Sequence, residues 1–370
     1  MTSSSTAFVF LPSVLAKRIK QFHKLTMARD RNRSQLEQTA FHFRYRLGEY
    51  ALHGFVNFLS WAPDWIVRSF VSVMSRVTFL LFWQYRARMH ANVTAALGSE
   101  IPDEAERKAI VRRAWRNFAL GVLDTTKILH YSKQQVIARI EFSGEEHVKR
   151  ALAKGKGVLA LSAHLGGFTV LGPRLAAAGY PFSVVVKHPR DKRFAHAMNE
   201  YRANLGVHTI SAKPRREAVR GILKALRENR IVMVIADEFK SGDVMINFFG
   251  QRCAAPRGPA SLALRTGAAT LPMFAVRRPD QSFMLTVHPE IEPVHKETLE
   301  ESVAATTMVY SERLEEEIRR YPDQWNWLGF PRADRLSRAE EARLADIGAH
   351  ESEDAESLNA KRSTVAVKQL

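Results

Sequence analysis

A histidine follows an apolar run at positions 157–162, and two glycines, Gly166 and Gly167, come directly after it. The imidazole of His164 has an ordinary pKa of about 6.5, so it can accept a proton from a hydroxyl group at neutral pH and return it later. The glycines let the backbone turn tightly and approach a ligand. His164 is therefore a candidate general base. The alternative is a structural histidine satisfied within the fold.

Two adjacent carboxylates follow a second apolar run. Positions 231–236 are apolar, and Asp237 and Glu238 come next. One of these carboxylates could orient His164 and stabilise its imidazolium form, as the third member of a catalytic triad does. The alternative is that they cap a helix or a loop.

A third apolar run, at 182–187, ends in a basic cluster. Four Lys and Arg residues, among them Lys187 and Arg190, lie between positions 187 and 193. Such a cluster can hold a phosphate group, although a run of charges is more commonly a solvated surface.

Short β-rich runs alternate with helical windows after position 139. The expected strands are 157–162, 182–187, 207–211, 231–236 and 269–276, and the expected helices are 169–178, 193–204, 215–229 and 258–266. This alternation predicts an α/β fold with a mostly parallel sheet and helices on both faces, with ligands binding at the carboxyl ends of the strands. We also expect a helix over 100–138, a hairpin at 244–252 and a helix over 299–320.

The composition indicates an anionic partner and excludes several chemistries. The chain carries 55 Lys and Arg against 38 Asp and Glu, a formal charge of +17. The basic runs contain few aromatic residues, so we expect no nucleic-acid partner. The single cysteine, Cys253, excludes an intramolecular disulfide framework and a cysteine-rich zinc site. No serine-hydrolase elbow, dinucleotide fingerprint, Walker A motif or metal-ligand spacing is present.

The segment 64–83 is the most hydrophobic stretch of the chain. On a helical wheel its polar residues gather on one arc, which indicates an amphipathic helix. Tryptophans at both ends, Trp65 and Trp83, suit a membrane interface, so we expect the helix to lie in the interface, an ordinary packed helix being the alternative. A flexible basic arm is expected at 1–40, a core domain at 41–334, and a charged, disordered tail at 335–370.

Further motifs surround these candidate residues. They are Arg44-Tyr45-Arg46, Asn92-Val93-Thr94-Ala95-Ala96-Leu97, Gly155-Lys156-Gly157, Tyr201-Arg202 with Gly206, Phe248-Phe249-Gly250, the stretch 258–268 with Pro272, and Trp325-Asn326-Trp327. Together with His164 they make the chain similar to the lauroyl/myristoyl acyltransferases of lipid A synthesis, within the wider lysophospholipid acyltransferase superfamily. The resemblance covers roughly positions 42–332.

The resemblance implies a reaction and a location. A fatty acyl group would pass from an acyl carrier protein or coenzyme A thioester to a hydroxyl of a membrane lipid or glycolipid, such as a lipid A precursor, with no permanently bound cofactor. The protein would lie on the cytoplasmic face of the inner membrane, bound to anionic lipids peripherally or by shallow insertion.

Roles for the remaining candidate residues follow from this reaction. His164 would be the general base, with Asp237 or Glu238 as its orienting group. The amides of Gly166 and Gly167 would stabilise the oxyanion. Phosphates of the acceptor or carrier would be bound by basic side chains, namely Lys187, Arg190, Arg202 and Arg257.

One position departs from the family pattern. The family's histidine is followed, after four residues, by an acid, whereas this chain has Thr169 there. A threonine cannot carry the charge that stabilises an imidazolium. Three interpretations stay open: Asp237 or Glu238 supplies the carboxylate, the acceptor is an amine or a more acidic group, or the protein has lost catalysis and kept lipid binding.

Overall fold

The computed structural model describes residues 63–331, apart from 129–130, 189–191 and 240–241. The chain divides into two compact units, Met1–Ala62 and Pro63–Leu370, and every described residue belongs to the second. The expected basic arm, the motif around Tyr45, the candidate residue Arg190 and the charged tail therefore lie outside the described residues.

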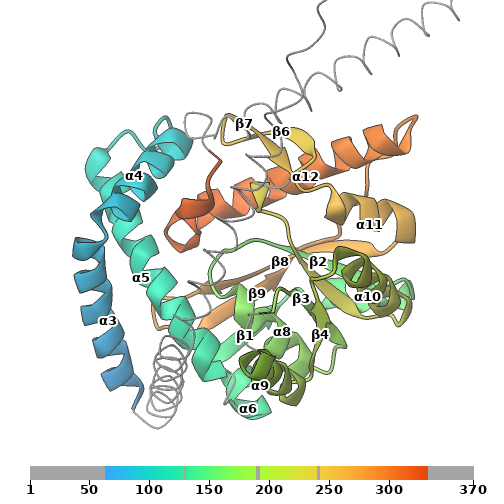
Figure 1. Ribbon diagram of the computed structural model, residues 1–370, viewed down its shortest axis with the longest axis horizontal. Helices are drawn as coiled ribbons and strands as arrows, with labels where there is room; N and C mark the ends of the chain where they lie inside the picture. The colour runs from blue at the N-terminus through green and yellow to red at the C-terminus, as the bar shows by residue number, and fades with distance from the viewer. Residues whose placement is uncertain (1–62, 129–130, 189–191, 240–241, 332–370) are drawn as a thin grey trace, which may run out of the picture. The chain divides into compact units, whose positions relative to one another are not determined.

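A mostly parallel sheet forms the centre of the described region, as the sequence predicts (Figure 1). Its order is β1-β9-β8-β2-β5-β3-β4, and β6 and β7 pair as a separate hairpin. Strands β8, β2, β5, β3 and β4 run parallel to one another, while β9 is antiparallel to β8 and parallel to β1. The strands are β1 Ile140–Ser143, β2 Val158–Ser162, β3 Phe182–Val186, β4 Val207–Ser211, β5 Ile231–Ile235, β6 Val244–Phe248, β7 Gln251–Ala255, β8 Ala269–Arg277 and β9 Phe283–Val287.

Helices cover both faces of this sheet (Figure 1). Alternate residues of β2 belong to different cores: Leu159 and Leu161 pack with residues of α4, α5, α10, α11 and α12, whereas Val158 and Ala160 pack with residues of α6, α7 and α8. The helices are α3 Asp64–Leu81, α4 Trp83–Leu97, α5 Glu104–Ile128, α6 Lys133–Arg139, α7 Glu145–Ala153, α8 Phe168–Ala177, α9 Lys192–Asn204, α10 Arg215–Arg227, α11 Gly258–Thr266 and α12 Leu299–Arg320, followed by short 3₁₀ turns, η2 Pro322–Gln324 and η3 Trp327–Gly329.

The sequence-based boundaries are wrong in three places. The sequence does not predict strand β1, at one edge of the sheet, or its neighbour β9; β1 is only four residues long, which leaves little periodicity to detect. The expected helix over 100–138 is two helices, α5 and α6, and α6 begins at its own capping box on Ser132. The expected helix over 64–83 ends at Leu81.

The segment after Leu81 turns sharply. Helices α3 and α4 are bent by 88° at the break between them. Among the described residues no single helix has the length and apolar character to span a membrane, and this bent pair meets those criteria only when its two helices are taken together.

Helix α3 packs on the fold through a face that mixes polar and apolar residues. Val67 and Ser75 are buried, Arg68 donates to Oε1 of Gln281 at 3.2 Å, and Nε1 of Trp115 donates to the hydroxyl of Thr78 at 3.1 Å. Many of its large apolar side chains are exposed on the other side, namely Trp65, Val73, Met74, Val77, Leu80 and Leu81. A helix of a globular fold normally buries its apolar face, so the exposed apolar side chains of α3 form an unusual surface.

Candidate active site

The exits of the adjacent strands β2 and β5 bring His164 and Asp237 together. Residues 158–162 pair in register with residues 231–235, so both strands deliver their next residues to the same edge of the sheet. Nδ1 of His164 lies 2.9 Å from Oδ1 of Asp237. The Asp237 side chain is only 2% exposed, while that of His164 is 32% exposed. The carboxylate is therefore sequestered and the imidazole stays accessible.

Three hydrogen-bond donors surround the Asp237 carboxylate. Besides the imidazole at Oδ1, the backbone amide of His164 donates to Oδ2 at 2.8 Å, and the indole Nε1 of Trp325 donates to Oδ2 at 2.9 Å. A buried carboxylate is costly unless hydrogen bonds replace its lost hydration. These donors meet that requirement, and they fix the carboxylate relative to both the histidine loop and the segment after α12.

The carboxylate sets the state of the imidazole. With Asp237 ionised, Nδ1 of His164 carries the hydrogen, which leaves Nε2 as a proton acceptor in the neutral ring. The hydrogen bond to Asp237 raises the pKa of His164 above its ordinary value of 6.5, with smaller support from the charges of Asp237 and Glu238, and partial burial opposes this rise. The arrangement matches the histidine and carboxylate of a triad without a nucleophilic side chain.

Neither Glu238 nor Thr169 takes the place of Asp237. Glu238 is exposed and acts on His164 only through its charge. The hydroxyl of Thr169 lies 2.9 Å from that of Thr125, which itself donates to the carbonyl of Gly121 at 2.7 Å. Because the Thr125 hydrogen is used in that bond, Thr169 is the donor to Thr125. Its hydroxyl proton is therefore directed toward α5.

The two glycines are required for the shape of the loop, but their amides are occupied. Gly166 has φ of +56°, and a Cβ there would lie 2.3 Å from the carbonyl oxygen of Ala275. Its amide donates to the carbonyl of Gln324, and the amide of Gly167 donates to that of Ala275. The expectation that these amides face an oxyanion is wrong for this geometry, because both already donate to protein carbonyls.

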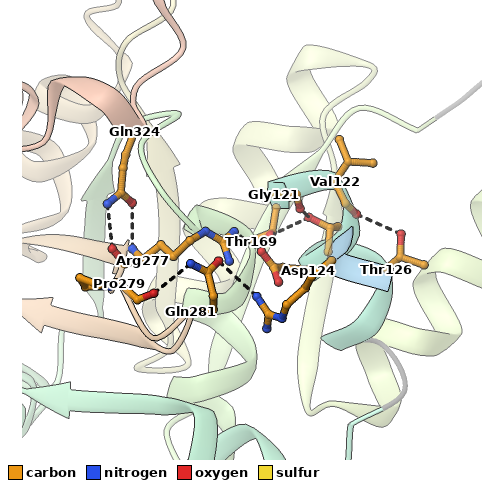
Figure 2. A network of polar contacts seen from close by, with 11 residues as sticks. Gly121, Val122, Asp124, Thr126, Thr169, Arg277, Pro279, Gln281 and Gln324 are labelled. Atoms are coloured by element: carbon orange, nitrogen blue, oxygen red, sulfur yellow. Dashed lines mark hydrogen bonds and ion pairs between the residues drawn. The ribbon is translucent and has the colours of Figure 1, made fainter. Parts of the chain in front are cut away.

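The segment after α12 holds the histidine loop from the other side. Leu165 forms a β-bridge with Trp325, and the amide of Asn326 donates to the carbonyl of His164 at 3.3 Å. The Gln324 side chain is itself fixed, because it accepts from the backbone amide of Arg277 at 2.8 Å and donates to the backbone carbonyl of Arg277 at 2.9 Å. Figure 2 shows this pairing, with the Arg277 guanidinium continuing toward its ion pair with Asp124 on α5.

A cavity of about 260 Å³ opens beside His164. Its wall is mostly apolar, and α5 contributes much of it. The lining residues are Met89, Ala114, Trp115, Asn117, Phe118, Gly121, Val122, Thr125, His164, Gly166, Phe168, Thr169, Gln324, Trp325, Asn326 and Leu328. Phe118 and Val122 also belong to the exposed apolar surface of the protein. The cavity therefore connects the imidazole with an apolar outer surface.

The basic candidates that the structure describes do not line this cavity. Lys187 is exposed after β3, and Arg202 on α9 is half-buried and donates to Oδ1 of Asn199 at 3.0 Å. Burial lowers the pKa of Arg202. Arg257 forms an ion pair with Glu300 of α12, so much of its charge is already compensated. Within the described residues no group of histidine, cysteine, aspartate and glutamate side chains could hold a metal ion.

Two parts of the site were missed from sequence. Trp325 was noted as part of a motif, but its indole hydrogen bond to Asp237 was not foreseen. The α5 wall was also missed, although Ala114, Phe118 and Val122 already stand at helical spacing in the sequence. Such spacing normally indicates a buried face, and no local signal distinguishes a buried face from a cavity wall.

Comparisons of the sequence with known proteins match acyltransferases. A family model described as bacterial lipid A biosynthesis acyltransferase matches residues 35–330. A phosphatidylinositol mannoside acyltransferase of Mycolicibacterium smegmatis is 27% identical over 296 residues, which is 76% of this chain and 93% of that protein. A lipid A biosynthesis acyltransferase of Haemophilus influenzae is 21% identical over 61% of this chain and 69% of that protein.

A similarity to a solved structure was also found. The 1-acyl-sn-glycerophosphate acyltransferase PlsC of Thermotoga maritima has 15% sequence identity and a TM-score of 0.32, covering 66% of this chain and 97% of that one.

The contact between His164 and Asp237 gives a prediction for titration. Asp237→Asn removes the charged acceptor at Nδ1, so the pKa of His164 should fall relative to the unsubstituted protein. Glu238→Gln removes a charge that acts without a hydrogen bond, so it should lower the same pKa less. NMR titration of the imidazole ring of His164 measures both values. An unchanged pKa in Asp237→Asn would contradict the assigned contact.

Proposed function

Because the chain belongs to the bacterial lipid A biosynthesis acyltransferase family and is an acyltransferase, we propose a specific transfer reaction for it. A fatty acyl group passes from a thioester to a hydroxyl of a membrane lipid or glycolipid, such as a lipid A precursor. The thioester is that of acyl carrier protein or of coenzyme A. The observation that carries this proposal is the accessible His164, paired with buried Asp237, at the wall of an apolar cavity.

The proposed reaction is a direct transfer. Nε2 of His164 accepts the proton of the acceptor hydroxyl while its oxygen attacks the thioester carbonyl carbon, forming a tetrahedral intermediate. Collapse of the intermediate breaks the carbon–sulfur bond, and the departing thiolate takes the proton from Nε2. The products are the ester and the free thiol. Asp237 holds the ring in the required tautomer and stabilises the imidazolium between the two proton transfers.

The oxyanion requires donors other than the two glycine amides. The first-turn amides of α8, those of Phe168 and Thr169, lie next along the chain and belong to residues that line the cavity. Amides in the first turn of a helix have no acceptor within the helix, and the helix dipole favours negative charge at that end. We assign oxyanion stabilisation to these amides.

This geometry favours a relocated acid over the other interpretations of Thr169. Asp237 also has a structural role through Trp325, but that role alone does not require the carboxylate to be hydrogen-bonded to an accessible imidazole. An amine acceptor would not need the carboxylate either, since an amine requires less base assistance. The pairing of Asp237 with His164 supports a hydroxyl acceptor and an active enzyme.

The outward apolar face of α3 supports peripheral membrane association. Exposed apolar side chains continue from α3 across the bend to Phe82, Trp83 and Tyr85. The cavity-lining Phe118 and Val122 of α5, which packs against α3, are exposed as well. We propose that this surface enters the interface of an anionic membrane, on the cytoplasmic face of the inner membrane, so that lipid substrates reach the cavity without crossing water.

Phosphate groups of the substrates would lie outside the cavity. Lys187 follows β3, which pairs with β5, so it belongs to the same edge of the sheet as Asp237. Lys187 and Arg202 are the candidates for these phosphates among the described residues. Arg257 is the weaker candidate, because Glu300 already pairs with it.

Replacing the base tests the reaction. His164→Ala should lower the rate of acyl transfer by about 100- to 10,000-fold, the usual contribution of general-base catalysis. The assay uses palmitoyl thioesters of both coenzyme A and acyl carrier protein with a lipid extract as acceptor, and mass spectrometry detects the acylated lipid. Flotation with liposomes should be unchanged. Undiminished turnover in this variant would overturn the role of His164.

Charge on the apolar face of α3 tests membrane docking. Val73→Glu and Leu80→Glu should each weaken flotation with phosphatidylglycerol-containing liposomes by about tenfold or more, since burial of such a side chain is worth roughly 1.5–3 kcal/mol. Val219→Glu is the matched control, because Val219 is also an exposed valine but lies on α10, outside this surface. Equal flotation of all three variants would argue against docking through this face.

A further inference from the structure

One face of helix α5 forms a continuous wall of the cavity. The residues that line it recur at intervals of three and four, which places them on one stripe of the helix. They are Ala114, Trp115, Asn117, Phe118, Gly121, Val122 and Thr125. Any side chain at position 121 would therefore stand on this stripe, between the side chains of residues 118 and 125.

Gly121 is the one member of the stripe without a side chain. A Cβ placed there meets no heavy atom within 4 Å beyond its immediate chain surroundings. Two other helical glycines differ: a Cβ at Gly172 would lie 2.7 Å from the ring of Phe182, and one at Gly221 would lie 2.8 Å from Ile210. Close packing explains why positions 172 and 221 carry no side chain, but it does not explain the absence of a side chain at position 121.

The backbone gives no reason for a glycine either. Gly121 lies inside the 25-residue helix α5, and its φ is not in the left-handed region. A glycine in a helix interior is unfavourable relative to alanine, because it orders a more flexible chain and packs nothing. The space beside Gly121 is thus kept open at a cost in helix stability, and it belongs to the cavity that contains His164.

The wall around Gly121 is held at a fixed distance from the histidine loop. The Gly121 carbonyl accepts from Thr125, which accepts in turn from Thr169 at the start of α8. Figure 2 shows Gly121 and Thr169 at the two ends of this chain of contacts. An acyl chain whose carbonyl carbon lies at His164 therefore runs along a wall whose position α8 fixes.

We propose that Gly121 determines which acyl chains the enzyme accepts, because the missing side chain leaves room in the cavity for a long fatty acyl group. This inference rests on the proposed function, since it takes the cavity beside His164 to be the site of the acyl chain. A side chain at position 121 shortens the space available and shifts the preference toward shorter chains.

The test measures chain-length preference and stability in the same variants. Gly121→Ala and Gly121→Leu are compared with the unsubstituted protein, using a mixture of lauroyl, myristoyl, palmitoyl and stearoyl thioesters in competition for one lipid extract. Mass spectrometry of the acylated lipids gives the relative kcat/KM for each chain. Ala105→Leu, on an exposed part of α5, is the matched control for adding a side chain to this helix.

The expected result has two parts. Gly121→Leu should lower kcat/KM for the longest chain that the unsubstituted protein accepts by about 10- to 200-fold relative to the shortest, the discrimination an apolar pocket gives for a methylene or two. Gly121→Ala should show a smaller shift and raise the midpoint of thermal unfolding by about 1–4 °C. Ala105→Leu should keep the original preference.

Failure of this inference can be told from failure of the proposed function. If the unsubstituted protein acylates no lipid with any of the thioesters, the proposed function fails. If it is active, and folded Gly121→Leu keeps the same chain-length preference or loses activity equally for every chain, the assignment of Gly121 is overturned. A loss of folding in Gly121→Leu leaves Gly121→Ala as the deciding variant, with an unchanged preference again counting against the proposal.

Discussion

The site depends on one buried carboxylate. Asp237 is almost fully withdrawn from solvent, so its charge must be balanced by hydrogen bonds, and its three donors come from two segments far apart in the chain. His164 follows β2, and Trp325 follows α12. The adjacency of β2 and β5 in the sheet brings His164 to Asp237. The β-bridge between Leu165 and Trp325 brings the Trp325 indole to the same carboxylate. The carboxylate thus orders the imidazole and ties the segment after α12 to the sheet.

Under the proposed mechanism, this arrangement accounts for Thr169. The family resemblance implies an acid at that position, in the first turn of α8. Here the threonine hydroxyl donates to Thr125, and the carboxylate comes from the neighbouring strand exit. A carboxylate at Nδ1 supplies the same tautomer and the same charge whichever element carries it, because the imidazole responds to the position of the oxygen atoms. The contact with α5 gives Thr169 a structural part in the cavity wall.

Local patterns in the sequence predicted much of this architecture. Apolar runs such as 231–236 mark buried parallel strands, and their exits place His164 and Asp237 at one edge. The choice of Asp237 over Glu238 was beyond the sequence, since adjacent residues leave a strand on opposite sides and their burial depends on the distant Trp325. The hydrogen bonds of the Gly166 and Gly167 amides could not be predicted from sequence either, because their acceptors, Gln324 and Ala275, lie more than a hundred residues away. For α3 the helical wheel predicts a polar and an apolar face, but which of its residues contact the rest of the protein depends on the distant residues Gln281 and Trp115.

The central claim is that Asp237 has taken over the role of the missing motif acid, and paired substitutions test it most directly. Steady-state acyl transfer is measured for Asp237→Asn and for Thr169→Val, with circular dichroism confirming that both variants fold. Asp237→Asn should lose about 10⁴-fold in kcat, as a triad does when its carboxylate becomes an amide. Thr169→Val should stay within about tenfold of the unsubstituted enzyme, since it loses only a hydrogen bond of about 1 kcal/mol to Thr125. A large loss in Thr169→Val with near-normal turnover in Asp237→Asn would contradict the account.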